Sequence, residues 1–150
     1  KADVADIYLL CSKNGLYYQY CPPFVTEQSI LDDMKALPPN KEICDKYYVG
    51  YYKEEELIAV MDFIMAYPDE KTAFIGFFMT AASIQNAGIG SSIIDDLCRY
   101  LADIRLSSIR LGWVRGNPQA EHFGHKNNFK ETGITYDTDN YTVVVAQRVL

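Results

Sequence analysis

The pattern of apolar and polar positions divides the chain into two helical segments, three successive strands and a second half in which helices and strands alternate. Apolar side chains recur at helical spacing over 4–20, where Asn14-Gly15 interrupts the pattern and Pro22-Pro23 ends it. A second amphipathic helix is predicted to follow Thr26, its N-cap, and to stop before Pro38-Pro39. The N-terminal part is therefore expected to supply helices that cover a sheet formed farther along the chain.

Three segments rich in β-branched and aromatic residues follow, at 47–52, 57–66 and 72–80. The connections between them, 53–56 and 67–71, are short and polar. Connections of this kind join neighbouring antiparallel strands, whereas parallel strands need a long crossover. The three strands are therefore expected to form an antiparallel meander.

The second half alternates between helices and strands. Isoleucine and leucine recur at helical spacing over 88–106, which is the clearest helix of the chain. A helix over 118–126 is predicted from Pro118 in its first turn and Asn117 as its N-cap. Strands are expected at 108–114, 129–136 and 141–149. This order predicts one α/β (α+β) domain over 1–150, with a mixed, mostly antiparallel twisted sheet between helices.

Composition narrows the class of protein. The net charge is −6 with no basic stripe, which argues against nucleic acid as a partner. No apolar run approaches the roughly 20 residues that cross a bilayer, and the first residues do not resemble a signal peptide. The four cysteines lack metal-site or redox spacing, and only two histidines are present. We expect a cytoplasmic protein with reduced, buried thiols, no metal site and no membrane partner.

Residues 80–92 carry the first sign of chemistry. A buried strand ends near Thr80, and a loop of small residues leads into a helix at about Gly88. The first amides of a helix lack internal partners and attract anions, and Gly88 and Gly90 leave room for a phosphate to approach. The segment lacks the Gly-Lys-Ser/Thr of a P-loop and the third glycine of a dinucleotide fingerprint. A purely structural strand–helix junction remains an alternative.

Two motifs in this part of the chain resemble the GNAT superfamily of acetyltransferases. Gln85-Asn-Ala-Gly88-Ile-Gly90 resembles its Gln/Arg-x-x-Gly-x-Gly/Ala pattern, and Asn117-Pro-Gln-Ala-Glu-His-Phe123, about 27 residues on, resembles its second block. The segment 45–79 is also similar to a little-characterised bacterial group of the superfamily. The resemblance covers nearly the whole chain, and the family's first strand is expected to be missing or trimmed. It implies a GNAT-like fold, and a homodimer as one expected assembly.

The resemblance also implies acetyl-CoA as co-substrate and a role for particular residues. Backbone amides would bind the pyrophosphate at Gln85, Asn86, Ala87, Gly88, Ile89, Gly90 and Ser91. Main-chain groups of Phe78, Met79 and Thr80 would pair with the pantetheine arm like an added strand. The side chain of Asn117 would contact the same arm, with Phe123 packed beside it. A simple N-cap is the alternative role of Asn117.

The sequence departs from the family at the usual catalytic acid. A tyrosine often follows the phenylalanine of the second block, and here that residue is Gly124. Asp62, alone among apolar neighbours, is a candidate base, since burial would raise its pKa; a solvent-facing position is the alternative. His122 and His125 flank the missing tyrosine and can relay protons, unless they simply lie on the surface. Proton transfer through water needs none of these three.

The leading expectation is an N-acetyltransferase that moves an acetyl group from acetyl-CoA to a primary amine of a small molecule or peptide by direct attack. Gly124 motivates the alternative of a non-catalytic CoA or acyl-CoA module or sensor on the same fold. A structural protein with an empty glycine-rich junction is a third option. Clustered tyrosines at 17–20 and 47–52 indicate either a site for a cation or simple packing.

Overall fold

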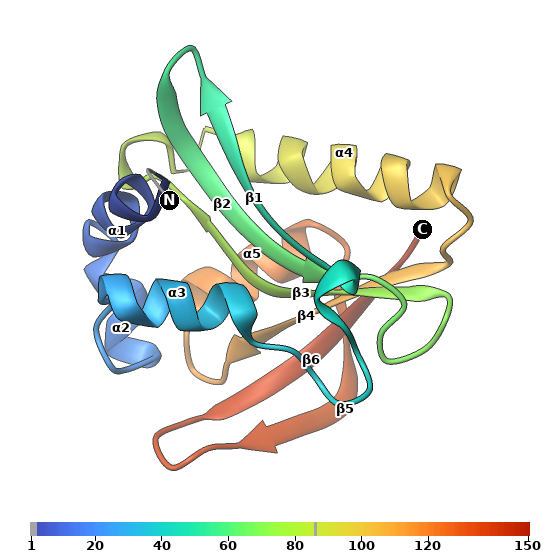
Figure 1. The fold of residues 1–150 in the computed structure, drawn as a ribbon. Helices are drawn as coiled ribbons and strands as arrows, with labels where there is room; N and C mark the ends of the chain where they lie inside the picture. Colours follow the sequence, from blue (N-terminus) through green and yellow to red (C-terminus); the bar gives the residue numbers. More distant parts are fainter. Residues whose placement is uncertain (1–2, 86) are drawn as a thin grey trace.

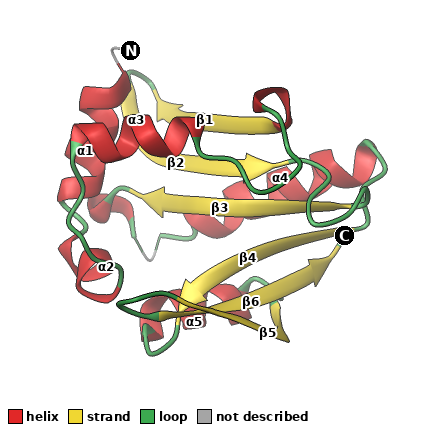
Figure 2. Ribbon diagram, turned by 60° about the horizontal axis from the view of Figure 1, so that its bottom comes forward, coloured by secondary structure: helices red, strands yellow, loops and turns green. Residues whose placement is uncertain are grey.

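The structure, a computed structural model, describes residues 3–85 and 87–150, so Asn86 lies outside the described residues. One six-stranded sheet has the order β1-β2-β3-β4-β6-β5, and helices cover both of its faces (Figures 1 and 2). The strands are β1 (Lys46–Lys53), β2 (Glu56–Ile64), β3 (Thr72–Thr80), β4 (Ser108–Val114), β5 (Lys130–Asp137) and β6 (Thr142–Val149). The helices are α1 (Asp3–Ser12), α2 (Gly15–Tyr20), α3 (Glu27–Lys35), α4 (Ile89–Asp103) and α5 (Pro118–Lys126), with single 3-10 turns η1 (Ile43–Asp45) and η2 (Ala82–Ile84).

The predicted order of elements is confirmed, with shifts of a few residues at their ends. The break at Asn14 divides the first helical segment into α1 and α2, and the buried Asn14 side chain donates to the Leu10 carbonyl at 3.0 Å. Thr26 caps α3: its hydroxyl accepts from the Ser29 amide, and the Ser29 hydroxyl accepts from the Thr26 amide. Serine thus performs the part that glutamate usually has in a capping box.

The sheet consists of two antiparallel halves joined by a short parallel contact. Strands β1, β2 and β3 form the predicted meander, and β4, β6 and β5 form the other half. Between the halves, β3 and β4 pair only from Thr72–Ser108 to Ile75–Leu111. Beyond these pairs 76–80 and 112–114 diverge, as Figure 2 shows. This separation of the two strand backbones is called the β3–β4 gap below.

Two hydrophobic clusters lie on opposite faces of the sheet. The larger cluster packs α4 against the sheet and includes Ile94, Leu101, Trp113 and Phe129. The smaller cluster lies under α1 and α3 and is formed by residues such as Ile7, Ile30, Val60 and Met79. Within 3–85 and 87–150, no helix is both long and apolar enough to cross a membrane.

The four thiols are unpaired, but they are not all buried. Cys11 and Cys98 are buried as expected, while Cys21 is half-buried and Cys44 is exposed. The expectation of burial is therefore wrong for Cys21 and Cys44. Both lie outside the regular helices and strands that form the core, Cys21 just after α2 and Cys44 in η1.

Candidate functional site

The first turn of α4 lies at the mouth of the β3–β4 gap. The amide of Ser92 donates to the Gly88 carbonyl at 3.1 Å, the first hydrogen bond of the helix. The amides of Ile89, Gly90 and Ser91 therefore have no partner within the helix. These amides and the positive end of the helix dipole favour an anion at this position.

The two glycines of the loop serve different purposes. Gly88 has φ of 79°, a left-handed conformation, and an added Cβ would meet nothing within 4 Å. Gly90 instead permits close packing, since an added Cβ would lie 3.0 Å from the Phe123 ring and 3.5 Å from the Thr80 methyl. Gly88 thus provides the turn and open space beside the helix end, while Gly90 brings α4, α5 and β3 together.

A bulge in β3 decides which side chains reach each face of the gap. The pairing of β2 with β3 shifts between Asp62 and Phe63, so that Gly76 is the extra residue on β3. Ile75 faces the α4 side before the shift, whereas Phe77 and Met79 face the α1 side after it. Phe78 consequently turns toward α5, with its ring centroid 5.9 Å from that of Phe123.

Gln85 joins three elements around the gap through its side chain. Its Nε2 donates to Asn14 Oδ1 at 2.5 Å and to the Thr80 carbonyl at 3.3 Å. Its Oε1 accepts from Gln119 Nε2 on α5 at 3.2 Å. The Thr80 carbonyl also accepts from Asn14 Nδ2 at 3.3 Å. Sequence reasoning missed Asn14 and Gln119, because their partners lie far away along the chain.

Asn117 is the N-cap of α5. It is only 4 % exposed, and its Oδ1 accepts from the Ala120 amide at 3.3 Å. The capping alternative is therefore confirmed, and this oxygen is already engaged. Contact between Asn117 and a pantetheine arm stays a prediction, as do the anion-binding roles of Gln85, Ala87 and Ser91.

The space beside residue 124, the position at which the family often has a tyrosine, is filled by a side chain from β4. Gly124 is buried, and an added Cβ would lie 3.0 Å or closer from the six-membered ring of Trp113 on β4. The Gly124 carbonyl accepts from the Phe129 amide at 2.9 Å. Trp113 therefore occupies the space into which any side chain at position 124 would project.

Asp62 is buried and paired. It is 8 % exposed and lies on the α3 side of β2, so the alternative of a solvent-facing position is wrong. Its Oδ2 accepts from Lys46 Nζ at 2.9 Å, and among the described residues its Oδ1 has no hydrogen-bond partner. Burial raises the pKa of Asp62, and the neighbouring Lys46 ammonium partly offsets the rise. The carboxyl is separated from the β3–β4 gap by the width of β3.

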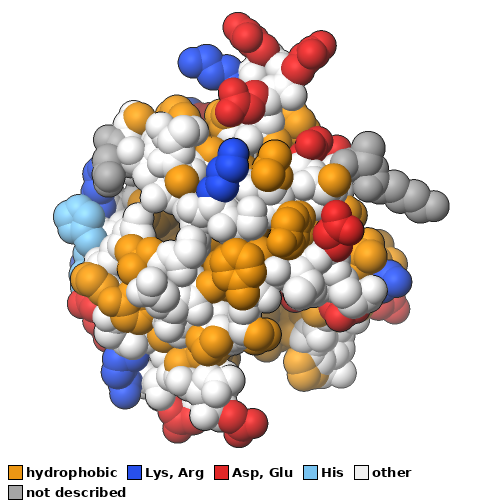
Figure 3. Space-filling view, turned by 90° about the vertical axis from the view of Figure 1, so that its left-hand side faces the viewer, with side chains coloured by type: hydrophobic (Ala, Val, Ile, Leu, Met, Phe, Trp, Pro, Cys, Tyr) orange, Lys and Arg blue, Asp and Glu red, His pale blue; other side chains and the backbone are white. Residues whose placement is uncertain are grey.

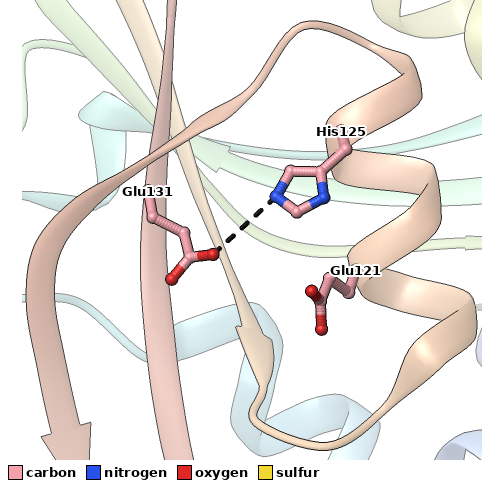
Figure 4. Close-up of side chains that lie close together, drawn as sticks. All are labelled: Glu121, His125 and Glu131. Atoms are coloured by element: carbon pink, nitrogen blue, oxygen red, sulfur yellow. Dashed lines mark ion pairs between the residues drawn. The ribbon is translucent and has the colours of Figure 1, made fainter.

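Both histidines of α5 lie on the surface, as the simpler alternative predicted. His122 and His125 are exposed. The His125 ring lies edge-on to Trp113, with centroids 5.4 Å apart, and its Nε2 is 3.8 Å from Glu131 Oε2 on β5 (Figure 4). His125 therefore points toward β5, and the structure does not bring the two histidines together with Asp62.

Comparison with known proteins decides the family. The family model described as acetyltransferase (GNAT) family matches residues 14–129, more than half of the chain. The chain belongs to the GNAT acetyltransferase family. The family uses acetyl-CoA, which is thus the co-substrate expected at the β3–β4 gap. No curated protein matches the sequence closely enough to count as a relative.

Solved structures share the whole fold of this GNAT protein at low sequence identity. An acetyltransferase from Thermus thermophilus has a TM-score of 0.79 at 14 % identity, over 99 % of this chain and 92 % of that chain. The ribosomal-protein-S18-alanine N-acetyltransferase from Escherichia coli has 0.72 at 12 %, over 99 % and 88 %. The spermidine N-acetyltransferase from Vibrio cholerae, solved with CoA and spermine, has 0.69 at 17 %, over 99 % and 90 %.

Particular residues beside the gap of this GNAT protein are expected to contact acetyl-CoA. The open space beside Gly88 and the three helix amides that have no partner within the helix suit a pyrophosphate. The β4-facing edge of β3 beyond Ile75, which pairs with no strand among residues 3–85 and 87–150, suits the amide groups of pantetheine. On the edge, the Thr80 carbonyl is already engaged by Asn14 and Gln85. Main-chain pairing is thus better supported at Phe78 and Met79 than at Thr80.

Aromatic side chains gather on the opposite, α2-facing side of the gap. The Tyr17 ring contacts Tyr18 and Phe77, with centroids 4.9 and 5.9 Å apart. Burial raises the pKa of Tyr17, and interaction with the Cys21 thiol raises the pKa of Tyr141 to about 12. Figure 3 shows this end of the molecule, where hydrophobic side chains surround a hollow. These residues connect α2 with both halves of the sheet.

Proposed function

We propose that this protein transfers the acetyl group of acetyl-CoA to a primary amine of a small molecule or peptide. The observation that carries the proposal is the first turn of α4, whose first three amides have no partner within the helix and lie beside the β3–β4 gap in a chain of the GNAT family. The amine nitrogen attacks the thioester carbonyl, the C–N bond forms as the C–S bond breaks, and one proton passes from nitrogen to sulfur.

The residues of this chain would bind and orient the co-substrate. The amides of Ile89, Gly90 and Ser91 hold the pyrophosphate, with the turn at Gly88 leaving that end of the helix open. The unpaired edge of β3 at Phe78 and Met79 extends along the pantetheine arm. Positioning of this kind accounts for a large share of catalysis when the reaction is a direct attack.

Proton transfer has weaker support from side chains. Asp62 is engaged by Lys46, and His125 faces β5. Gly124 supplies no hydroxyl, and Trp113 fills the space beside it. Water in the gap is therefore the proposed proton carrier.

The aromatic side of the gap is where the amine would enter. Tyr17 packs against Phe77 and interacts with Tyr141, and aromatic ring faces attract cations as well as apolar groups. An amine carried on an apolar or aromatic body suits this lining. The three rings give the acceptor its contacts on the side opposite to α4.

The binding step is tested with one charge-reversing variant and a matched control. Gly88→Asp places a carboxylate at the proposed pyrophosphate position, so affinity for acetyl-CoA measured by calorimetry should fall by at least tenfold. Gly133→Asp is the control, because Gly133 has a similar φ of 88°, lies in β5 and has open space around it. Unchanged affinity in Gly88→Asp, or an equal loss in Gly133→Asp, would contradict the proposed site.

Turnover is tested by following free CoA thiol with a panel of polyamines, aromatic amines and peptides. Thiol release that depends on both acetyl-CoA and an amine is the expected result. The second candidate, a CoA or acyl-CoA module without turnover, is favoured by the packing of Trp113 against Gly124. Tight binding of acetyl-CoA without thiol release for any amine would establish that second function and reject the first.

A further inference from the structure

Three metal-ligating side chains converge outside the β3–β4 gap. Glu121 and His125 lie one helical turn apart on α5, and Glu131 lies on β5. One ligand atom from each lies within 4.8 Å of the others, and His125 Nε2 is 3.8 Å from Glu131 Oε2. Figure 4 shows the three side chains pointing toward one another. This group is called the Glu–His–Glu cluster below.

The distances between the ligand atoms of the cluster are close to those between the ligands of a bound zinc ion. Ligand atoms about 2.0–2.1 Å from a tetrahedral zinc ion lie roughly 3.4 Å apart. The His125–Glu131 separation of 3.8 Å needs only a small adjustment, and the remaining separations stay within 4.8 Å. His125 and Glu131 are about half exposed, so their side chains can change rotamer without disturbing the core.

The fold holds the histidine in a ligating direction. Trp113 lies edge-on to the His125 ring, and it reaches this position because Gly124, between the helix and the indole, has no side chain. Glu131 is fixed on β5 by its pairing with Ala146 of β6. The ligands thus come from two rigid elements, which is the arrangement that keeps a metal site in shape.

The charges around the cluster favour a cation. Within residues 3–85 and 87–150, neither Glu121 nor Glu131 forms an ion pair with lysine or arginine. Two carboxylates therefore lie close to one imidazole, and the repulsion between the two like charges favours binding of a cation.

We propose that the Glu–His–Glu cluster binds one divalent transition-metal ion of the zinc class and joins α5 to β5. The imidazole nitrogen selects zinc, nickel or copper over magnesium and calcium, which prefer oxygen ligands alone. With three protein ligands, the fourth position is open to water. A bound ion would fasten the helix that carries Asn117 and Phe123, so it stabilises one wall of the β3–β4 gap. The proposal does not depend on the acetyl-transfer function.

The test is calorimetric titration of the full chain with zinc chloride, without acetyl-CoA. Wild-type protein should bind one zinc ion at this cluster, and His125→Ala should weaken that binding by at least tenfold. Glu131→Gln should also weaken it. His122→Ala is the matched control, because it removes an exposed histidine from the same helix and should leave the affinity unchanged. Magnesium chloride should give no detectable binding.

A second set of measurements distinguishes zinc binding at the cluster from zinc binding at the exposed cysteine. Cys44 is exposed and its Sγ lies 3.8 Å from Glu42 Oε2, so the same titrations are repeated in a Cys44→Ser background. Circular dichroism should show that His125→Ala is folded, as expected for an exposed side chain. Absence of zinc binding to the Cys44→Ser background, or equal binding to its His125→Ala derivative, would overturn the proposal.

Discussion

Gly124 and Trp113 share one space between α5 and β4. A Cβ on residue 124 would lie 3.0 Å or closer from the indole ring, and Trp113 is itself 5 % exposed. The absence of a tyrosine at position 124 is therefore linked to the packing of Trp113 on the neighbouring strand. A hydroxyl cannot be restored at position 124 without moving the indole.

Replacement of Gly124 tests this relationship. Gly124→Tyr should lower the free energy of unfolding by about 1–3 kcal/mol or more, because overpacking forces side chains and backbone to shift. It should not increase acetyl transfer. Urea unfolding and thiol release are the measurements. The control is Gly15→Ala, since an added Cβ at Gly15 meets nothing within 4 Å and the variant should be at least as stable as wild type.

The companion variant relieves the clash. Trp113→Ala combined with Gly124→Tyr should be less destabilised than the sum of the two single changes, because the ring of the new tyrosine occupies the space that the indole leaves. Strict additivity of the two free energies, or a stable Gly124→Tyr single variant, would show that the indole does not limit position 124.

A second prediction concerns the hydrogen bonds of Gln85 around the gap. Gln85→Ala removes its bonds to Asn14, Thr80 and Gln119, and should lower the affinity for acetyl-CoA several-fold because the loop before α4 loses its anchors. In a double-mutant cycle, Asn14→Ala and Gln85→Ala should show a coupling of about 1 kcal/mol in the free energy of unfolding.

The exposed Gln19 on α2 provides the control for this cycle. Gln19→Ala should change neither affinity nor stability, and should be additive with Asn14→Ala. A coupling near zero between Asn14 and Gln85 would mean that their hydrogen bond does not hold the break between α1 and α2 to the loop before α4.

Local signals explain how much of the fold was predictable. Pro22-Pro23, Thr26 and Asn117 act on their immediate neighbours, so the ends and caps of the helices could be predicted from short segments. The bulge at Gly76 could not, because the strand around it is apolar at nearly every position. Without alternation of polar and apolar residues, no period reveals which face each side chain takes.

The candidate site, too, could be predicted only where its residues are neighbours in the sequence. The glycine-rich loop is continuous in sequence, and its position at the N-terminal end of α4 was predicted correctly. Lys46 beside Asp62 and Glu131 beside His125 come from other elements, and only the fold brings them together. The spacing of Glu121 and His125, one helical turn apart, indicates from the sequence that these two can pair, but Glu131 joins them only in the fold.

A third prediction separates stability from catalysis at Asp62. Burial raises the pKa of Asp62 despite the Lys46 ion pair, so the neutral side chain of Asp62→Asn should not lower the free energy of unfolding at neutral pH. Because β3 separates the carboxyl from the gap, kcat of the folded variant should change by less than about threefold, far less than the 10²–10⁴-fold contribution of a general base. A fall in kcat of a hundredfold, with loss of the acidic limb of the pH profile, would instead identify Asp62 as the base.

The pH dependence of stability provides the fourth prediction. Burial raises the pKa of Asp62 above its ordinary value of 3.8, against the opposing effect of Lys46. The folded state therefore holds this proton more tightly than the unfolded chain, and the free energy of unfolding falls as pH rises from about 3.8 through the raised pKa. Asp33, whose pKa is also raised by burial, contributes with the same sign.

The comparison of wild type with Asp62→Asn isolates the contribution of one carboxyl. The stability of wild type minus that of Asp62→Asn, measured by urea unfolding at a series of pH values, should decrease over this window and then become constant. The same difference between Asp33→Asn and the double variant Asp33→Asn/Asp62→Asn removes the influence of the neighbouring acid. A difference that rises with pH in both backgrounds would show that Lys46 outweighs burial and holds the pKa of Asp62 below 3.8.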